Sequence, residues 1–253
     1  QMISASMVTL SRIFPPSQVM MAPYIFKNDA IAWEVVDGPY GQKMLDAFTA
    51  KTGIKALAIV DSGFLTITNS KRTVRTPADF KGIKFRAMGP LQANMFKSLG
   101  ASAIPIPWPE TYTSLQTGVA HGQTNAAFVV AVFKLYEVQE YLSLANSQFG
   151  YQLWLCNKSW YDGLSKMEKD VLRDAVNAGR MSTRAMALLR EQESITQLKK
   201  AGMKITALTG AEISDLQQLA GPASLKWLKT KMDPKWVNDL QSAVDQAERK
   251  LGY

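Results

Sequence analysis

Arg86 is the residue of this chain whose type and setting point most directly to ligand chemistry. It lies in an otherwise apolar segment, Ile83–Met88, that is predicted to form a strand. A guanidinium group stays charged when buried and presents a planar fork of donors that matches a carboxylate. The pattern alone leaves two interpretations open. It favours an exposed arginine on the polar face of the strand, because period-two alternation places Lys84 on the same side.

Asn125 and Trp108 are two further candidates for ligand contact, and each has a purely structural alternative. Asn125 ends the segment Gly122–Asn125, and asparagine is also a common turn residue. Trp108 stands between two prolines, where it would serve equally well as an anchor of the core. Each of these signals is weak when it is taken alone.

The residues that most enzyme chemistry requires are scarce. His121 is the only histidine, which makes a histidine-based triad or a multi-histidine metal site implausible. No phosphate-binding loop or dinucleotide motif is present, and no cofactor is expected. Cys156 lies in an apolar run and is expected to be a small buried hydrophobe. Paired carboxylates that meet in space remain open, but no spacing indicates them, so catalysis is disfavoured.

The composition is that of a globular protein with a basic balance. Of 253 residues, 47% are apolar and 20% are charged. No apolar run approaches the ~20 residues that a membrane span needs, so direct membrane insertion is not expected. The net charge of +8 raises nucleic acid or an anionic surface as a partner. The basic residues are scattered, however, and no recognition motif accompanies the densest cluster, Lys71–Arg75, so nucleic-acid binding is disfavoured.

Short β-rich runs alternate with helical stretches along the chain, which predicts an α/β fold. Strands are expected at residues 53–61, 65–69, 83–88, 103–107 and 203–208. Thr76–Asp79 has the threonine and proline of a helix start, and Thr209–Glu212 is a capping box. Asp233–Pro234 begins the last helix.

One predicted helix is too long for a small lobe. Ser165–Glu168 is a capping box, and helical residues follow almost unbroken to Ala201. The residues predicted to form its apolar face, by their helical spacing, are Val171, Leu172, Ala175, Ala178, Leu188, Leu189, Ile195 and Leu198. At 1.5 Å per residue the helix would span roughly 50 Å, so we expect it to bridge two lobes.

Several long motifs stand in one order along nearly the whole chain. They are APYIFKND (22–29), TNSKR (68–72), TPADFKGIKFR (76–86), LGA (99–101), ETYTSLQTG (110–118), GQTN (122–125) and FKLYEVQEY (133–141). In order and spacing these motifs resemble the DctP-like family of solute-binding proteins of TRAP transporters. Members of that family begin with a strand and a helix before the stretch matching Gln1–Pro16, and we expect those elements to be absent here.

The resemblance implies a fold and a division of the chain. It implies an α/β, two-lobed periplasmic binding protein of the class II type, with a long lobe-spanning helix and a ligand cleft between the lobes. Residues 1–62 and 151–190 are expected to form lobe I. Residues 63–150 and 191–253 are expected to form lobe II.

The resemblance also implies roles for individual residues. Arg86 matches the family's carboxylate-binding arginine, Asn125 a second polar contact, Trp108 an aromatic wall and Ser6 a position near the pocket. Further walls of the pocket are expected at Phe64, Leu65, Met88, Phe128 and Trp154. Leu65 stands where many members have a second arginine, and His121, Thr124 and Ala126 also depart from the family pattern. These features favour a monocarboxylate with an apolar or aromatic body over a sugar acid or a C4 dicarboxylate.

The function that the resemblance implies is uptake of a small organic acid. The protein would be periplasmic and would deliver its ligand to the small and large TRAP membrane subunits. Three alternatives stay open: a binding protein of an ABC-type importer or a sensor, an enzyme on the same fold, and a binder of anionic surfaces.

Overall fold

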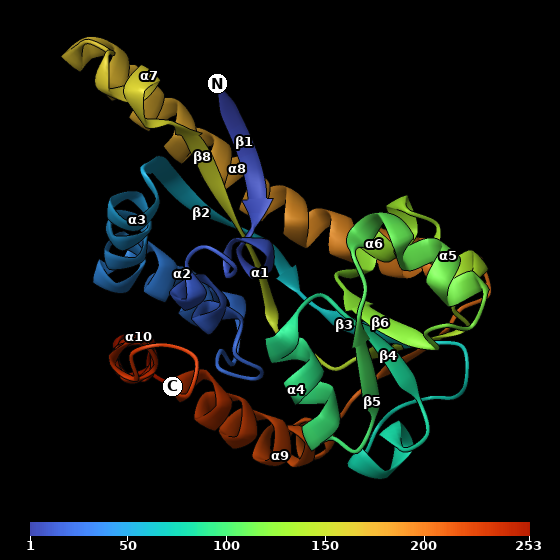
Figure 1. Ribbon diagram of the computed structural model, residues 1–253. Helices are drawn as coiled ribbons and strands as arrows, with labels where there is room; N and C mark the ends of the chain where they lie inside the picture. The colour runs from blue at the N-terminus through green and yellow to red at the C-terminus, as the bar shows by residue number, and fades with distance from the viewer.

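The computed structural model describes residues 1–253 and places them in two lobes that one long helix connects (Figure 1). The first lobe is built on a three-stranded antiparallel sheet in the order β1-β8-β2. The second lobe is built on a six-stranded mixed sheet in the order β5-β4-β6-β3-β7-β9. The two-lobed α/β fold expected from the sequence is confirmed.

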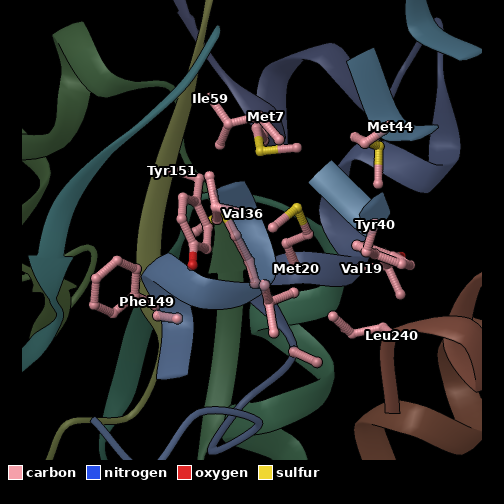
Figure 2. Packing of buried hydrophobic residues seen from close by; sticks show 14 of the residues in the cluster. Met7, Val19, Met20, Val36, Tyr40, Met44, Ile59, Phe149, Tyr151 and Leu240 are labelled. Carbon is pink, nitrogen blue, oxygen red and sulfur yellow. The ribbon is translucent and has the colours of Figure 1, made fainter. Parts of the chain in front are cut away.

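Helices pack on the sheet of the first lobe to form its core. The elements of this lobe are β1 (Met2–Ser6), α1 (Met7–Leu10), the 3-10 helix η1 (Pro15–Met21), α2 (Asp29–Asp37), α3 (Pro39–Thr52), β2 (Ile54–Phe64) and β8 (Phe149–Asn157). Met7, Met20 and Met44 pack near Ile59 and Tyr151 in one buried cluster (Figure 2). This cluster fixes η1 in place, and η1 borders the space between the lobes.

The second lobe brings the carboxyl ends of three strands to one edge of its sheet. β4 (Lys84–Ala87) lies between β5 and β6 and runs parallel to both. The other elements are β3 (Thr66–Asn69), η2 (Pro77–Phe80), α4 (Pro90–Ser98), β5 (Ser102–Pro105), η3 (Trp108–Glu110), α5 (Thr111–Gln116), β6 (Gly122–Asn125), α6 (Ala127–Val132), η4 (Leu135–Glu137), β7 (Tyr141–Leu144) and β9 (Lys204–Ala207). Carboxyl ends of parallel strands are the usual place for ligand contacts in an α/β sheet.

The long helix is α8 (Lys166–Lys200), which follows the short α7 (Lys158–Asp162). Its 35 residues span about 50 Å at 1.5 Å per residue, and it packs on β2 of the first lobe and on α6 of the second. The Ser165 capping box is formed as expected. The predicted apolar face is buried in part: Leu198 is fully buried, and Leu172 and Ile195 pack against core clusters, but Val171 is 64% exposed and Leu189 60%. Val171 and Leu189 have helical spacing, but they lie away from the buried side of the helix, which includes Val176 as well as the predicted Leu198.

The C-terminal helices correct one part of the expected division. β9 and the first part of α9 (Gly210–Lys229) belong to the second lobe, where Leu216 packs. α10 (Lys235–Leu251) returns to the first lobe, and its Leu240 joins the same cluster as Tyr40 (Figure 2). The amphipathic pattern of α10 defines its apolar face, but a pattern does not say which lobe that face meets.

Candidate functional site

A cleft of about 1540 Å³ separates the two lobes. The first lobe contributes Ser6 and Gln18 to its lining, and the second contributes Arg86, Trp108 and Asn125. Ligand sites commonly measure roughly 300–1,000 Å³, so a small molecule would fill this cleft only if the lobes came closer.

Arg86 projects into this cleft from the central parallel strands. It lies near the carboxyl end of β4, and its side chain is buried, with only 3% of the residue exposed. The Nε group donates a hydrogen bond of 2.9 Å to the carbonyl of Ile106, while Nη1 has no partner. The guanidinium carbon lies 5.7 Å from the centre of the Trp108 ring. The exposed position that the strand pattern favoured is therefore wrong, because β4 is an inner strand and the segment that follows β5, with Ile106 and Trp108, packs beside the Arg86 side chain.

A second buried arginine shows what is unusual about Arg86. Arg184 of α8 is 6% exposed and forms ion pairs with Asp37 at 2.7 Å and with Asp61 at 3.3 Å. Arg86 forms no ion pair with any carboxylate of the protein. Burial lowers the pKa of Arg86 to about 10, so the group is charged at neutral pH. A buried charge without a counter-ion is costly, and an anion in the cleft would remove that cost.

Trp108 and Asn125 border the same space as Arg86. The Trp108 ring meets Phe133 edge-to-face, with ring centroids 4.9 Å apart. The Asn125 amide nitrogen donates to Gln123 Oε1 at 2.5 Å, which leaves the Asn125 side-chain oxygen free for another partner. The hydroxyl of Thr66 donates to the Asn125 carbonyl and holds the end of β6.

Four other predicted residues also line the cleft, namely Ser6, Leu65, Met88 and Phe128. The hydroxyl of Ser6 accepts a hydrogen bond from the backbone nitrogen of Val8, so it also caps α1. Its remaining hydrogen-bonding capacity is what a ligand would meet.

Phe64 and Trp154 were expected as pocket walls, and the structure places both outside the lining of the cleft. Phe64 packs edge-to-face on Phe149, with ring centroids 4.8 Å apart. Trp154 lies farther along β8, where its ring packs against Gly179 of α8. The long helix packs on this part of the sheet, so Trp154 is a partly buried packing residue outside the lining of the cleft.

Comparison with known proteins identifies the family. The model of the bacterial extracellular solute-binding proteins, family 7, matches residues 1–230. The chain belongs to this family.

Three relatives illustrate the match. A solute-binding protein of Verminephrobacter eiseniae is 34% identical over 192 residues, which cover 76% of this chain and 57% of the relative. The 2,3-diketo-L-gulonate-binding periplasmic protein of Escherichia coli is 33% identical over 239 residues, which cover 92% of this chain and 70% of the relative. A TRAP periplasmic solute-binding protein of Desulfovibrio salexigens, with bound orotic acid, superposes with a TM-score of 0.91 at 26% identity. That superposition covers 98% of this chain and 79% of the other.

The length of the chain differs from that of these relatives. It spans between about half and three quarters of the two curated relatives, namely 57% and 70% of their lengths. Members of family 7 are binding proteins of transport systems, not enzymes, which agrees with the scarcity of catalytic residues noted in the sequence.

The cleft of this family 7 protein also contains residues that the sequence did not single out. They are Arg12, Gln18, Tyr151, Trp227 and Lys231. Trp227 and Lys231 come from the end of α9 and its following turn, more than a hundred residues away from Arg86. Gln18 is flanked by apolar residues and prolines, and Arg12 belongs to no recognised motif. Only the return of α9 to the first lobe, and the packing of η1, reveal them.

Proposed function

We propose that this chain is the solute-binding protein of a TRAP-type uptake system and that it captures a small organic carboxylate on Arg86. The observation that carries the proposal is the guanidinium of Arg86, which is buried, charged and without a counter-ion in the protein, and which lines the cleft between the two lobes. A carboxylate supplies the missing charge and can accept hydrogen bonds from the Nη groups of Arg86, of which Nη1 has no partner in the protein.

The energetics are consistent with a small ligand held by both charge and burial. A micromolar Kd needs about −8 kcal/mol. Charge-assisted hydrogen bonds contribute ~1.5–3 kcal/mol each, so two bonds to Arg86 supply roughly 3–6 kcal/mol. The remainder must come from burying the ligand body, at ~25 cal/mol per Å², against walls such as Trp108, Leu65 and Phe128. Movement of the lobes toward each other would provide that burial.

The proposed location and partners follow from the family and its members. Family 7 consists of solute-binding proteins described as extracellular, and the Escherichia coli and Desulfovibrio salexigens relatives are described as periplasmic. We place this chain in the periplasm, where it would deliver its ligand to the small and large TRAP membrane subunits. None of its helices has the length and apolar character to cross a membrane.

A thermal-shift screen of organic acids tests the proposal on the unmodified chain and on Arg86→Met. Stabilisation by one class of carboxylate is expected in the unmodified chain. The variant should lose it, because removing one partner of a buried charge pair costs about 3–5 kcal/mol. Lys84→Met is the matched control, since Lys84 lies on the same strand but not in the cleft. Binding that survives in Arg86→Met, or no binding of any acid, would reject this function.

A further inference from the structure

Gln18 is a buried side chain that lacks the hydrogen bonds its amide requires. It lies in η1 of the first lobe, it is 5% exposed, and it lines the cleft. Its side-chain oxygen is buried with no partner in the protein. Buried polar groups in folded proteins are almost always paired, so an unpaired amide facing a cleft indicates a partner from outside.

The other buried glutamines show that the lack is specific to this position. There are four of them, namely Gln92, Gln123, Gln139 and Gln148. Gln92 accepts from the Met88 backbone and donates to Gln148, and Gln148 donates to the carbonyl of Met21. Each of the remaining two is also hydrogen-bonded, Gln123 to Thr68 and Gln139 to Thr68 and to backbone carbonyls. Gln18 is the exception, and it is the one that borders the cleft.

Side chains with unpaired polar atoms therefore line the cleft from both lobes. Arg86 belongs to the second lobe and Gln18 to the first, and both line the same space. Tyr151 of the first lobe also lines the cleft and has a hydroxyl without a partner, but its ring packs against Phe26 and Phe149 in the core of that lobe. A ligand that reaches both Arg86 and Gln18 spans the cleft and links the lobes.

We infer that Gln18 is the polar anchor of the ligand body, and that the substrate is a carboxylate carrying a hydroxyl, carbonyl or N–H group. This inference rests on the proposed function and specifies its substrate class. A primary amide has two N–H donors and one oxygen acceptor. A hydroxyl can both donate and accept a hydrogen bond, so it is the best match. A carboxylate with no polar group on its body would bury Gln18 without a partner when the lobes close, so the apolar or aromatic body that the sequence favoured would need at least one such group.

The chemistry of two relatives' ligands is compatible with this class. The Escherichia coli relative is described as binding 2,3-diketo-L-gulonate, and the Desulfovibrio salexigens structure contains orotic acid. Both molecules combine one carboxylate with carbonyl groups, and the first also has hydroxyls. The inference for this chain depends on Gln18 itself and not on those ligands.

Calorimetric titration of matched acid pairs tests the inference. The pairs differ by hydroxyl groups alone: lactate and propionate, mandelate and phenylacetate, and gluconate and hexanoate. In the unmodified chain, the hydroxylated acid of at least one pair should bind about tenfold tighter or more than the acid without hydroxyls. The acid without hydroxyls would leave the buried Gln18 amide unpaired. In Gln18→Met the ratio should fall to near one, with the apolar member bound equally well or better.

Controls separate this inference from the proposed function. Gln192→Met carries the same substitution on the exposed face of α8 and should keep the ratio of the unmodified chain. Gln18→Met removes an unpaired polar group beside apolar neighbours, so it should unfold no earlier than the unmodified chain on heating. No preference for any hydroxylated acid, or an unchanged ratio in Gln18→Met while Arg86→Met binds neither member, would overturn the inference alone. Unaltered binding in Arg86→Met would instead reject the proposed function.

Discussion

At the scale of single residues, two buried arginines should respond to the same substitution with opposite signs. Arg184 is paired with Asp37 and Asp61, whereas Arg86 has no counter-ion in the protein. Without ligand, Arg86→Met should raise the free energy of unfolding by about 1–2 kcal/mol, because it removes an unpaired buried charge. Arg184→Met should lower it by about 3–5 kcal/mol, because it leaves the buried Asp61 carboxylate without a counter-ion, whereas the exposed Asp37 keeps its ion pair with Arg180. Urea unfolding of both variants measures these changes.

A loss of stability in ligand-free Arg86→Met as large as that in Arg184→Met would contradict this prediction. It would mean that the Arg86 charge is already balanced within the protein. The prediction also distinguishes a role in ligand binding from a role in folding. Arg86 is expected to bind the ligand but to lower the free energy of unfolding when no ligand is bound.

Glu191 of α8 should make stability depend on pH. One of its carboxylate oxygens accepts a hydrogen bond of 3.1 Å from the backbone nitrogen of Ala127, at the start of α6. Burial raises the pKa of Glu191 to about 7. A raised pKa means that the folded state holds the proton more tightly than the unfolded chain, so stability falls as the pH rises from about 4.5 to 7. Below that window the carboxyl is protonated in both states, and the contribution is constant.

Glu191→Gln isolates this effect, because glutamine keeps an acceptor for Ala127 but does not ionise. Asp61, whose pKa burial also raises, is present in both proteins and cancels in the comparison. The melting temperature of the variant relative to the unmodified chain should therefore rise between pH 5 and pH 8. A difference that stays constant across this range would show that Glu191 titrates normally.

At the scale of elements, the long helix depends on its capping box. The Ser165 hydroxyl accepts from the backbone nitrogen of Glu168, and the Glu168 carboxylate accepts from that of Ser165. Ser165→Ala should lower the free energy of unfolding by about 1 kcal/mol. Ser182→Ala, at an exposed interior position of the same helix, should change it little or raise it slightly, because alanine favours a helix interior. Chemical unfolding of both variants compares the two, and equal losses would contradict a role for the cap.

The elements were predicted well where the deciding interactions are local. Both capping boxes, at Ser165 and at Thr209, form as their sequences indicate. Thr76 also forms its box with Asp79, but only the four-residue 3-10 helix η2 follows, because Gly82 adopts a positive φ of 79° and β4 begins at Lys84. Local signals therefore mark where a helix starts more reliably than how far it runs.

The site was predicted only in part, because burial depends on neighbours that are distant in sequence. The apolar strand around Arg86 was visible, but the cover of Arg86 comes from the segment that follows β5, and the residue pattern alone favoured exposure. Trp154 has the type of a pocket wall, yet it packs against α8 outside the lining of the cleft. Gln18 carries no sequence signal at all, since an unpaired amide is recognised only when its surroundings are known. The family resemblance predicted Arg86, Asn125 and Trp108 as site residues, and the other residues of the cleft are recognised only from the packing of the lobes.

At the scale of the whole molecule, the basic balance should favour capture of anions from solution. The chain has a net charge of +8, and Arg12 and Lys231 add two cationic side chains to the lining of the cleft. A positive cleft attracts a carboxylate before contact, which raises the association rate, and salt screens this attraction over a Debye length of about 10 Å at 0.1 M. The contacts with Arg86 form after docking, so the dissociation rate should depend on salt much less.

Stopped-flow fluorescence should show this directly, because Trp108 lies beside the Arg86 guanidinium and reports on occupancy of the site. For the acid that binds best in the screen, the association rate constant should fall several-fold, roughly three- to tenfold, between 10 mM and 500 mM NaCl. The same measurement on a variant with both Arg12→Gln and Lys231→Gln should give a shallower dependence on salt, with the ligand still held by Arg86. An association rate that ignores salt in the unmodified chain would mean that the charge of +8 serves no part of capture, and that the ligand reaches Arg86 by unassisted diffusion.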